Sequence, residues 1–140
     1  MTYEEWFLKQ GELHANVMKK LVNKTDDEVI EYFRFENMVK NEPDFCPLYK
    51  DNKKCHDYEK LNCYLCACPN FRFKMEGFEK TEDGKTLFSV CNIKSKDGAQ
   101  YIGEDYIHQN CSGCIVPHRE KYIKNHFNRN WFEVMKDVRG

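Results

Sequence analysis

Hydrophobic residues recur at helical spacing along the first forty residues of the chain, in two separate stripes. Each stripe follows a Thr-x-x-Glu sequence, beginning at Thr2 and at Thr25, which is typical of a capping box at a helix N-terminus. The stripes consist of Trp6, Leu13, Val17, Met18 and Leu21, and of Val29, Ile30, Phe33 and Met38. The pattern therefore predicts two helices, one on each side of residues 23–24.

From about residue 45 the pattern becomes extended and rich in cysteine. Phe71, Phe73 and Met75 alternate with polar residues, which indicates a strand, and residues 87–91 read as a second strand. The Asp83-Gly84 sequence between them favours a tight turn. We therefore expect a β-hairpin inside the cysteine-rich segment.

Helical spacing returns after Pro117, with a break or cap at Asn128 and Asn130. The apolar positions there are Tyr122, Ile123, Phe127, Trp131, Phe132 and Met135. The chain thus divides into a helical pair (1–44), a cysteine-rich metal-binding domain (45–118) and a C-terminal helical segment (119–140), packed as one globular unit. The expected fold class is α+β: a small, irregular, metal-stapled core with a β-hairpin, flanked by helices at both ends.

Composition sharpens this expectation. Only 140 residues are present, mean hydropathy is −0.82, and aromatic residues carry much of the apolar content. A chain with few aliphatic residues has difficulty filling a large core, and covalent or metal staples compensate for this. The net charge of −1 argues against nucleic acid and anionic membranes as partners. The aromatic helices are expected to pack on the cysteine-rich domain; binding a protein partner is the alternative.

The compartment decides how the cysteines are used. The chain begins without a basic segment followed by an apolar run, and contains no apolar run of about 18 residues, so we expect a cytoplasmic protein without a membrane span. Thiols stay reduced in the cytosol, which favours metal ligation over a disulfide framework.

Eight cysteines form the candidate metal-binding set, and all lie between residues 46 and 114. They are Cys46, Cys55, Cys63, Cys66, Cys68, Cys91, Cys111 and Cys114. Two Cys-x-x-Cys pairs, 63/66 and 111/114, give the strongest signal, because each can supply two corners of a tetrahedral zinc site. One partition joins these pairs in one site and leaves the other cysteines for a second site, but the sequence does not choose among connectivities.

Two histidines accompany the cysteines. His56 follows Cys55 directly, and His118 lies four residues beyond Cys114, so each is a candidate ligand or a group that orients a ligand. The alternative for His118 is a helix-start histidine that faces water. The remaining histidines lie outside the cysteine pattern and are expected to be ordinary surface or core residues.

Zinc is the expected metal, because it accepts mixed nitrogen and sulfur ligands and needs no redox partner. The alternative is an iron–sulfur protein with a role in redox chemistry or cofactor biosynthesis, since eight thiols suffice for two four-cysteine clusters. Neither Cys-x-x-Cys pair follows a buried aliphatic strand, which disfavours thioredoxin-type exchange. Carboxylate dyads, catalytic triads and phosphate-binding glycine loops are also missing, so the sequence leans away from an enzyme.

The cysteine motifs resemble those of the bacterial and archaeal cysteine-rich small domain family, which is regarded as metal-binding. The matching motifs are Cys46-Pro47-Leu48-Tyr49, Cys55-His56, residues 62–69, Cys91 and residues 111–119, which together span roughly residues 45–120. The resemblance implies that all eight cysteines, His56 and His118 belong to one functional constellation. It also implies a link to cofactor metabolism, because some members accompany cobalamin-related enzymes. The helices at both ends lie outside it.

Overall fold

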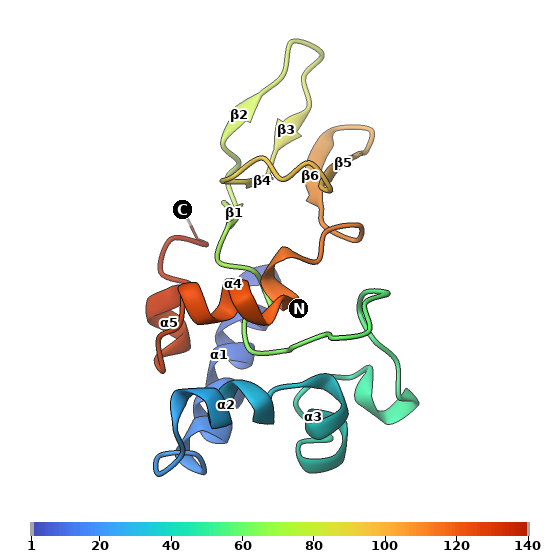
Figure 1. The fold of residues 1–140 in the computed structure, drawn as a ribbon. Coiled ribbons are helices and arrows are strands. Elements are labelled where there is room, and N and C mark those ends of the chain that lie inside the picture. The colour runs from blue at the N-terminus through green and yellow to red at the C-terminus, as the bar shows by residue number, and fades with distance from the viewer. Residues whose placement is uncertain (1, 140) are drawn as a thin grey trace.

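The computed structural model describes residues 2–139, and helices from both ends of the chain gather at one side of the molecule (Figure 1). None of the helices among these residues is both long and apolar enough to cross a membrane. The helices are α1 (Tyr3–Lys19), α2 (Asp26–Tyr32), α3 (Phe35–Asn41), α4 (Glu120–Asn125) and α5 (Trp131–Val134), with 3₁₀ turns η1 (Tyr49–Asp51) and η2 (Val116–His118).

Within residues 2–139, six short strands form two small sheets at the other side of the molecule (Figure 1). One sheet pairs β1 (Phe71–Phe73) with β4 (Ser89–Cys91). The second has the order β2-β3-β6-β5, formed by β2 (Glu79–Lys80), β3 (Thr86–Leu87), β6 (Tyr106–Asn110) and β5 (Ala99–Ile102). The α+β class is therefore confirmed.

The expected hairpin is present, but it is divided between the two sheets. Phe71 pairs with Cys91 and Phe73 with Ser89, as expected for the outer strands. The Asp83-Gly84 turn closes a separate inner hairpin, β2–β3, with Gly84 at φ 84°. The expected strand through Met75 ends at Phe73, and Met75 is exposed.

Both capping boxes are confirmed. Glu5 N–H donates to Thr2 Oγ1 (3.1 Å) and Thr2 N–H to the Glu5 carboxylate (3.1 Å) at the start of α1; Thr25 and Glu28 repeat this at α2. Gly11 interrupts the apolar stripe of α1 because a Cβ there would lie 2.1 Å from the Phe132 ring. The glycine thus lets the residues of α5 approach α1 closely.

The single helix expected after Thr25 is wrong: it breaks at Phe33 and Arg34 into α2 and α3. The cysteine-rich segment crosses the chain at this break, where Cys63 N–H donates to Phe33 O (2.8 Å) and Phe35 N–H donates to Leu61 O (3.0 Å). Arg34 and Asn62 form an isolated antiparallel bridge. These tertiary hydrogen bonds replace the helical ones that the break removes.

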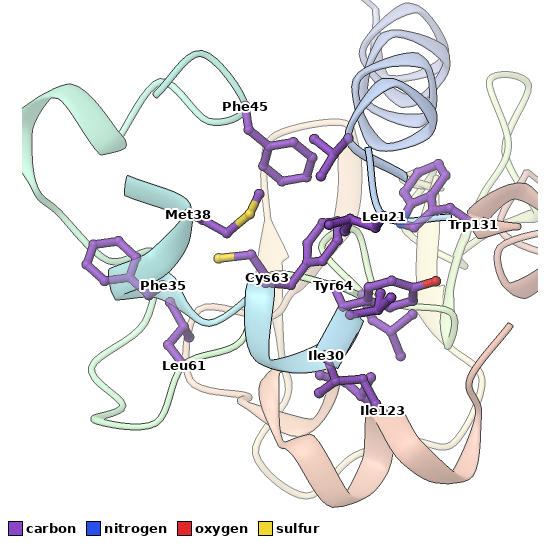
Figure 2. Close-up of a cluster of buried hydrophobic side chains, with 14 of the residues drawn as sticks. Leu21, Ile30, Phe35, Met38, Phe45, Leu61, Cys63, Tyr64, Ile123 and Trp131 are labelled. Carbon is purple, nitrogen blue, oxygen red and sulfur yellow. The ribbon is translucent and has the colours of Figure 1, made fainter. Parts of the chain in front are cut away.

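A continuous hydrophobic core lies among the helices and residues 61–65, which differs from the expected metal-stapled core without a large apolar interior. Aromatic side chains fill the volume that the scarce aliphatic residues leave, with Phe33 and Tyr64 fully buried and 4.9 Å apart between ring centroids. Cys63 belongs to this core, beside Met38 (Figure 2). Burial of apolar surface, in addition to any metal, therefore stabilises the fold.

Residues 61–65 form the crossing segment, which passes the break between α2 and α3. Asn62 connects this segment to the helices, and its side chain is fully buried. Its side-chain Nδ2 donates to Ile30 O (2.8 Å), while its Oδ1 accepts from Tyr64 N–H (2.9 Å). Both bonds lie where water cannot replace them.

Asn62→Ala is expected to lower the free energy of unfolding by about 2–4 kcal/mol, because two buried hydrogen bonds are lost and the Tyr64 N–H is left without a partner. Denaturant unfolding of the purified chain measures this. The matched control is Asn37→Ala, which removes a solvent-accessible bond to Glu31 O (2.9 Å) that water can replace. Equal losses for the two variants would contradict the role given to Asn62.

Candidate metal centre

The thiols of Cys46, Cys55, Cys63 and Cys66 form a first group, where the segment after α3 meets the crossing segment. Burial, followed by the neighbouring thiols of Cys55 and Cys46, raises the pKa of Cys63 to about 12, although the Tyr49 hydroxyl opposes the shift. Burial and the thiols of Cys63, Cys55 and Cys46 also raise the pKa of Cys66. All eight cysteines carry free thiols.

His118 lies against this group at the end of η2, and it is buried. Its Nδ1 is 2.9 Å from Asn62 O; because a carbonyl only accepts, Nδ1 carries the proton and donates. Burial lowers the pKa of His118 to about 4, with the neighbouring His56 adding to the effect, so the ring is neutral at pH 7. Its unprotonated Nε2 faces Cys55 Sγ at 3.7 Å.

His56 completes a group of three potential ligands. Its Nδ1 donates to Ser112 O at 3.0 Å, which leaves Nε2 free, and its ring centroid is 4.9 Å from that of His118. One ligand atom from each of Cys55, His56 and His118 lies within 4.8 Å of the others. Metal-bound imidazoles commonly donate their second N–H to a backbone carbonyl in this way.

The separation of Cys55 and His118 fits a tetrahedral ion. A sulfur and a nitrogen bound to one zinc lie about 3.6 Å apart, from zinc bond lengths of about 2.3 and 2.0–2.1 Å at a tetrahedral angle. The observed Sγ–Nε2 distance of 3.7 Å is close to this value. The trio thus has suitable donors and suitable spacing for one zinc ion.

An unpaired polar atom lies beside the first group. The Tyr49 hydroxyl is buried beside the Cys63 thiol, near enough to lower its pKa but without a hydrogen bond of regular geometry. Burial, with smaller effects from the thiols of Cys63, Cys46 and Cys66, raises the pKa of Tyr49. A neutral phenol in this position is a ready donor to a thiolate sulfur, and thiolates form when a metal binds.

The other four cysteines, Cys68, Cys91, Cys111 and Cys114, form a second group at the edge of the sheets. Burial, with the thiols of Cys111, Cys91 and Cys114, raises the pKa of Cys68 to about 11. Burial and the thiols of Cys114 and Cys91 likewise raise the pKa of Cys111 to about 11. The structure thus separates the two Cys-x-x-Cys pairs, whereas one sequence-based partition joined them.

Both groups border one cavity of about 280 Å³. Its lining includes two cysteines of the first group, Cys55 and Cys66, all four of the second group, and both His56 and His118. Its remaining walls include Tyr3, Trp6 and Phe71. An apolar wall around sulfur and imidazole ligands limits water access, which strengthens electrostatic contacts within the site.

Three features of the site were missed from sequence. Ala67 (φ 92°) and Cys68 (φ 57°) adopt left-handed backbone conformations, although neither is glycine. Ser95 contacts two sulfurs, and Asn62 holds the His118 ring. Asn62 could have been found from sequence, because it lies in the motif 62–69 that resembles the cysteine-rich small domain family. Ser95 could not, because its contacts with sulfur depend on the conformation of a loop.

No family model, no curated protein and no solved structure matches this chain. The resemblance to the cysteine-rich small domain family therefore stays a prediction from local motifs.

Proposed function

We propose that this chain is an intracellular metal-binding protein that holds zinc with cysteine thiolates and histidine imidazoles. The observation that supports this most directly is the trio Cys55, His56 and His118, whose ligand atoms lie within 4.8 Å of one another. Both imidazoles have their Nδ1 atoms bound to backbone carbonyls, so their free Nε2 atoms are fixed in the form that binds metal.

Zinc suits this trio better than iron–sulfur chemistry does. Two of the three donors are imidazoles, and mixed nitrogen and sulfur sets are common for zinc, while most iron–sulfur clusters are held by thiolates alone. The nearby thiols of Cys46, Cys63 and Cys66 can supply a fourth ligand.

Zinc at this position joins segments that are distant in the chain. Cys55 lies in the loop after η1, whereas His118 lies at the end of η2, 63 positions further along the chain. Structural zinc ions contribute about 10–16 kcal/mol of apparent binding free energy, which is as large as the whole stability of a typical domain. The proposed role is therefore structural, with catalysis not required.

Removing the metal from reduced protein with a chelator is expected to unfold residues 45–118, because the thiols and imidazoles lose the ion that joins them. Hydrogen exchange with and without chelator measures this, segment by segment. Addition of zinc to the chelated protein should restore protection of the same segment. Metal-free, fully reduced protein that keeps cooperative folding throughout would falsify the structural role.

His118→Ala is expected to weaken zinc binding by about 100-fold or more, since it removes a ligand whose geometry the backbone fixes. Competition with a chromophoric chelator measures the affinity. The matched control, His126→Ala, removes an exposed histidine whose Nδ1 also donates to a backbone carbonyl, Tyr122 O (2.9 Å), and should leave zinc affinity unchanged.

His118→Cys tests the same role by restoration, because a thiolate can replace an imidazole as a zinc ligand. It should recover much of the affinity that His118→Ala loses. If the alanine variant binds zinc as tightly as the unaltered chain does, His118 is not a ligand.

A further inference from the structure

We propose that Cys68, Cys91, Cys111 and Cys114 form a second metal site, made of four thiolates and separate from the Cys55–His56–His118 site. The inference rests on the proposed metal-binding function, but it uses none of the residues of the first site. It assigns a soft divalent cation to the edge of the β-sheets. The cysteine-rich segment then holds two ions with different ligand sets.

The chain reverses between the two groups. Ala67 and Cys68 are both left-handed, with φ values of 92° and 57°. Non-glycine residues rarely take this conformation, and two in succession require strong local constraints. Because of the reversal, Cys66 stays with Cys63, while Cys68 enters the segment that leads into β1.

Strand pairing brings three of the cysteines to one sheet edge. β3 runs parallel to β6, and Ser89 Oγ in β4 accepts a hydrogen bond from Gln109 N–H in β6 (2.7 Å). Cys91 and Cys111 each lie two residues beyond this contact, so they emerge side by side. Pairing of β4 with β1, extended by Asn92 N–H to Asn70 O (2.7 Å), brings Cys68 to the same edge.

The loop after β4 orients the sulfurs. Ser95 N–H lies 3.5 Å from Cys91 Sγ, and Ser95 Oγ lies 3.2 Å from Cys114 Sγ. Backbone N–H and hydroxyl groups that point at sulfur stabilise thiolates, and such outer contacts are common around metal–thiolate sites. One residue thus touches ligands from two distant parts of the chain.

The second Cys-x-x-Cys turn fits against the same loop. Cys114 N–H donates to Cys111 O (3.0 Å), which folds the pair into a tight turn. A Cβ at Gly113 would lie 3.2 Å from Asp97 O, so the turn and the 95–98 loop are in close contact. All four cysteines therefore border one cavity, and their sulfur atoms would have to move closer together to bind one ion.

Cobalt(II) provides the test, because it replaces zinc and its visible spectrum depends on the number of thiolate ligands. Reduced, full-length chain titrated without oxygen is expected to bind two equivalents of cobalt. Cys111→Ser should remove about one equivalent and leave the spectrum of a mixed nitrogen and sulfur site. The variant with Cys55→Ser and His118→Ala should lose the other and leave an all-thiolate spectrum.

A finer test keeps all eight cysteines. Ser95→Ala should weaken the all-thiolate site by about tenfold or more, since it removes the hydroxyl that contacts Cys114, and should leave the other site unchanged. The matched control is Thr81→Ala, whose hydroxyl accepts from Lys85 N–H (3.0 Å) in the β2–β3 hairpin and does not contact sulfur. If Cys111→Ser fails to fold, the comparison of these two variants tests the four-thiolate site in its place.

The outcomes separate the two proposals. A chain that binds one equivalent, which His118→Ala removes and Cys111→Ser does not, keeps the proposed function but overturns the second site. Loss of all cobalt from folded Cys111→Ser overturns the separation into two sites. An unaltered chain that binds no cobalt contradicts both proposals. Equal affinities for Ser95→Ala and Thr81→Ala count against the four-thiolate site.

Discussion

The hydrogen bonds of the buried backbone at residues 61–63 are the constraint on which the rest of the structure depends. Cys63 donates to Phe33 O (2.8 Å), Leu61 O accepts from Phe35, and Asn62 N–H donates to His118 O (3.2 Å). Peptide groups without access to water must find partners in the protein, so this segment is held between the two helical ends of the chain. The same contacts join the segment that carries Cys63 to the end of η2, which carries His118.

Two sources of stability meet in this segment. Tyr64 and Leu65 are fully buried in the aromatic core, while Cys63 and Cys66 on either side of them belong to the first thiol group. The core depends on apolar area alone, whereas the thiols are costly to bury as charges unless a cation compensates. Short strands and irregular loops around the second group bury few large apolar side chains, so the proposed second ion would contribute most to stability there.

Local signals in the sequence were sufficient for some elements. The capping boxes at Thr2 and Thr25 were predictable because their hydrogen bonds join residues only three positions apart. The break at Arg34 was not, because its cause is a segment almost thirty residues further along the chain. Likewise, the composition indicated a shortage of aliphatic residues, but it did not show that rings from both chain ends would fill the core together.

The sequence predicted all eight cysteines, His56 and His118 as candidate ligands. It did not predict how these residues divide into two groups. Cys63, Cys66 and Cys68 lie within six residues, and the sequence-based partition already assigned Cys68 to a different site from the other two. The left-handed conformations of Ala67 and Cys68 were not predicted. Strand register then decides which distant thiols meet. Such pairing is determined by long-range contacts, which residue spacing alone does not contain.

The two tryptophans lie in different environments. Trp6 borders the cavity between the thiol groups, and Trp131 is buried in the hydrophobic core at 3% exposure. Indole fluorescence responds to the polarity and quenching atoms around each ring, and sulfur is an effective quencher. Emission from Trp6 therefore reports on the cavity, while emission from Trp131 reports on global unfolding. With one of them replaced by phenylalanine, the chain carries its own optical probe for either event.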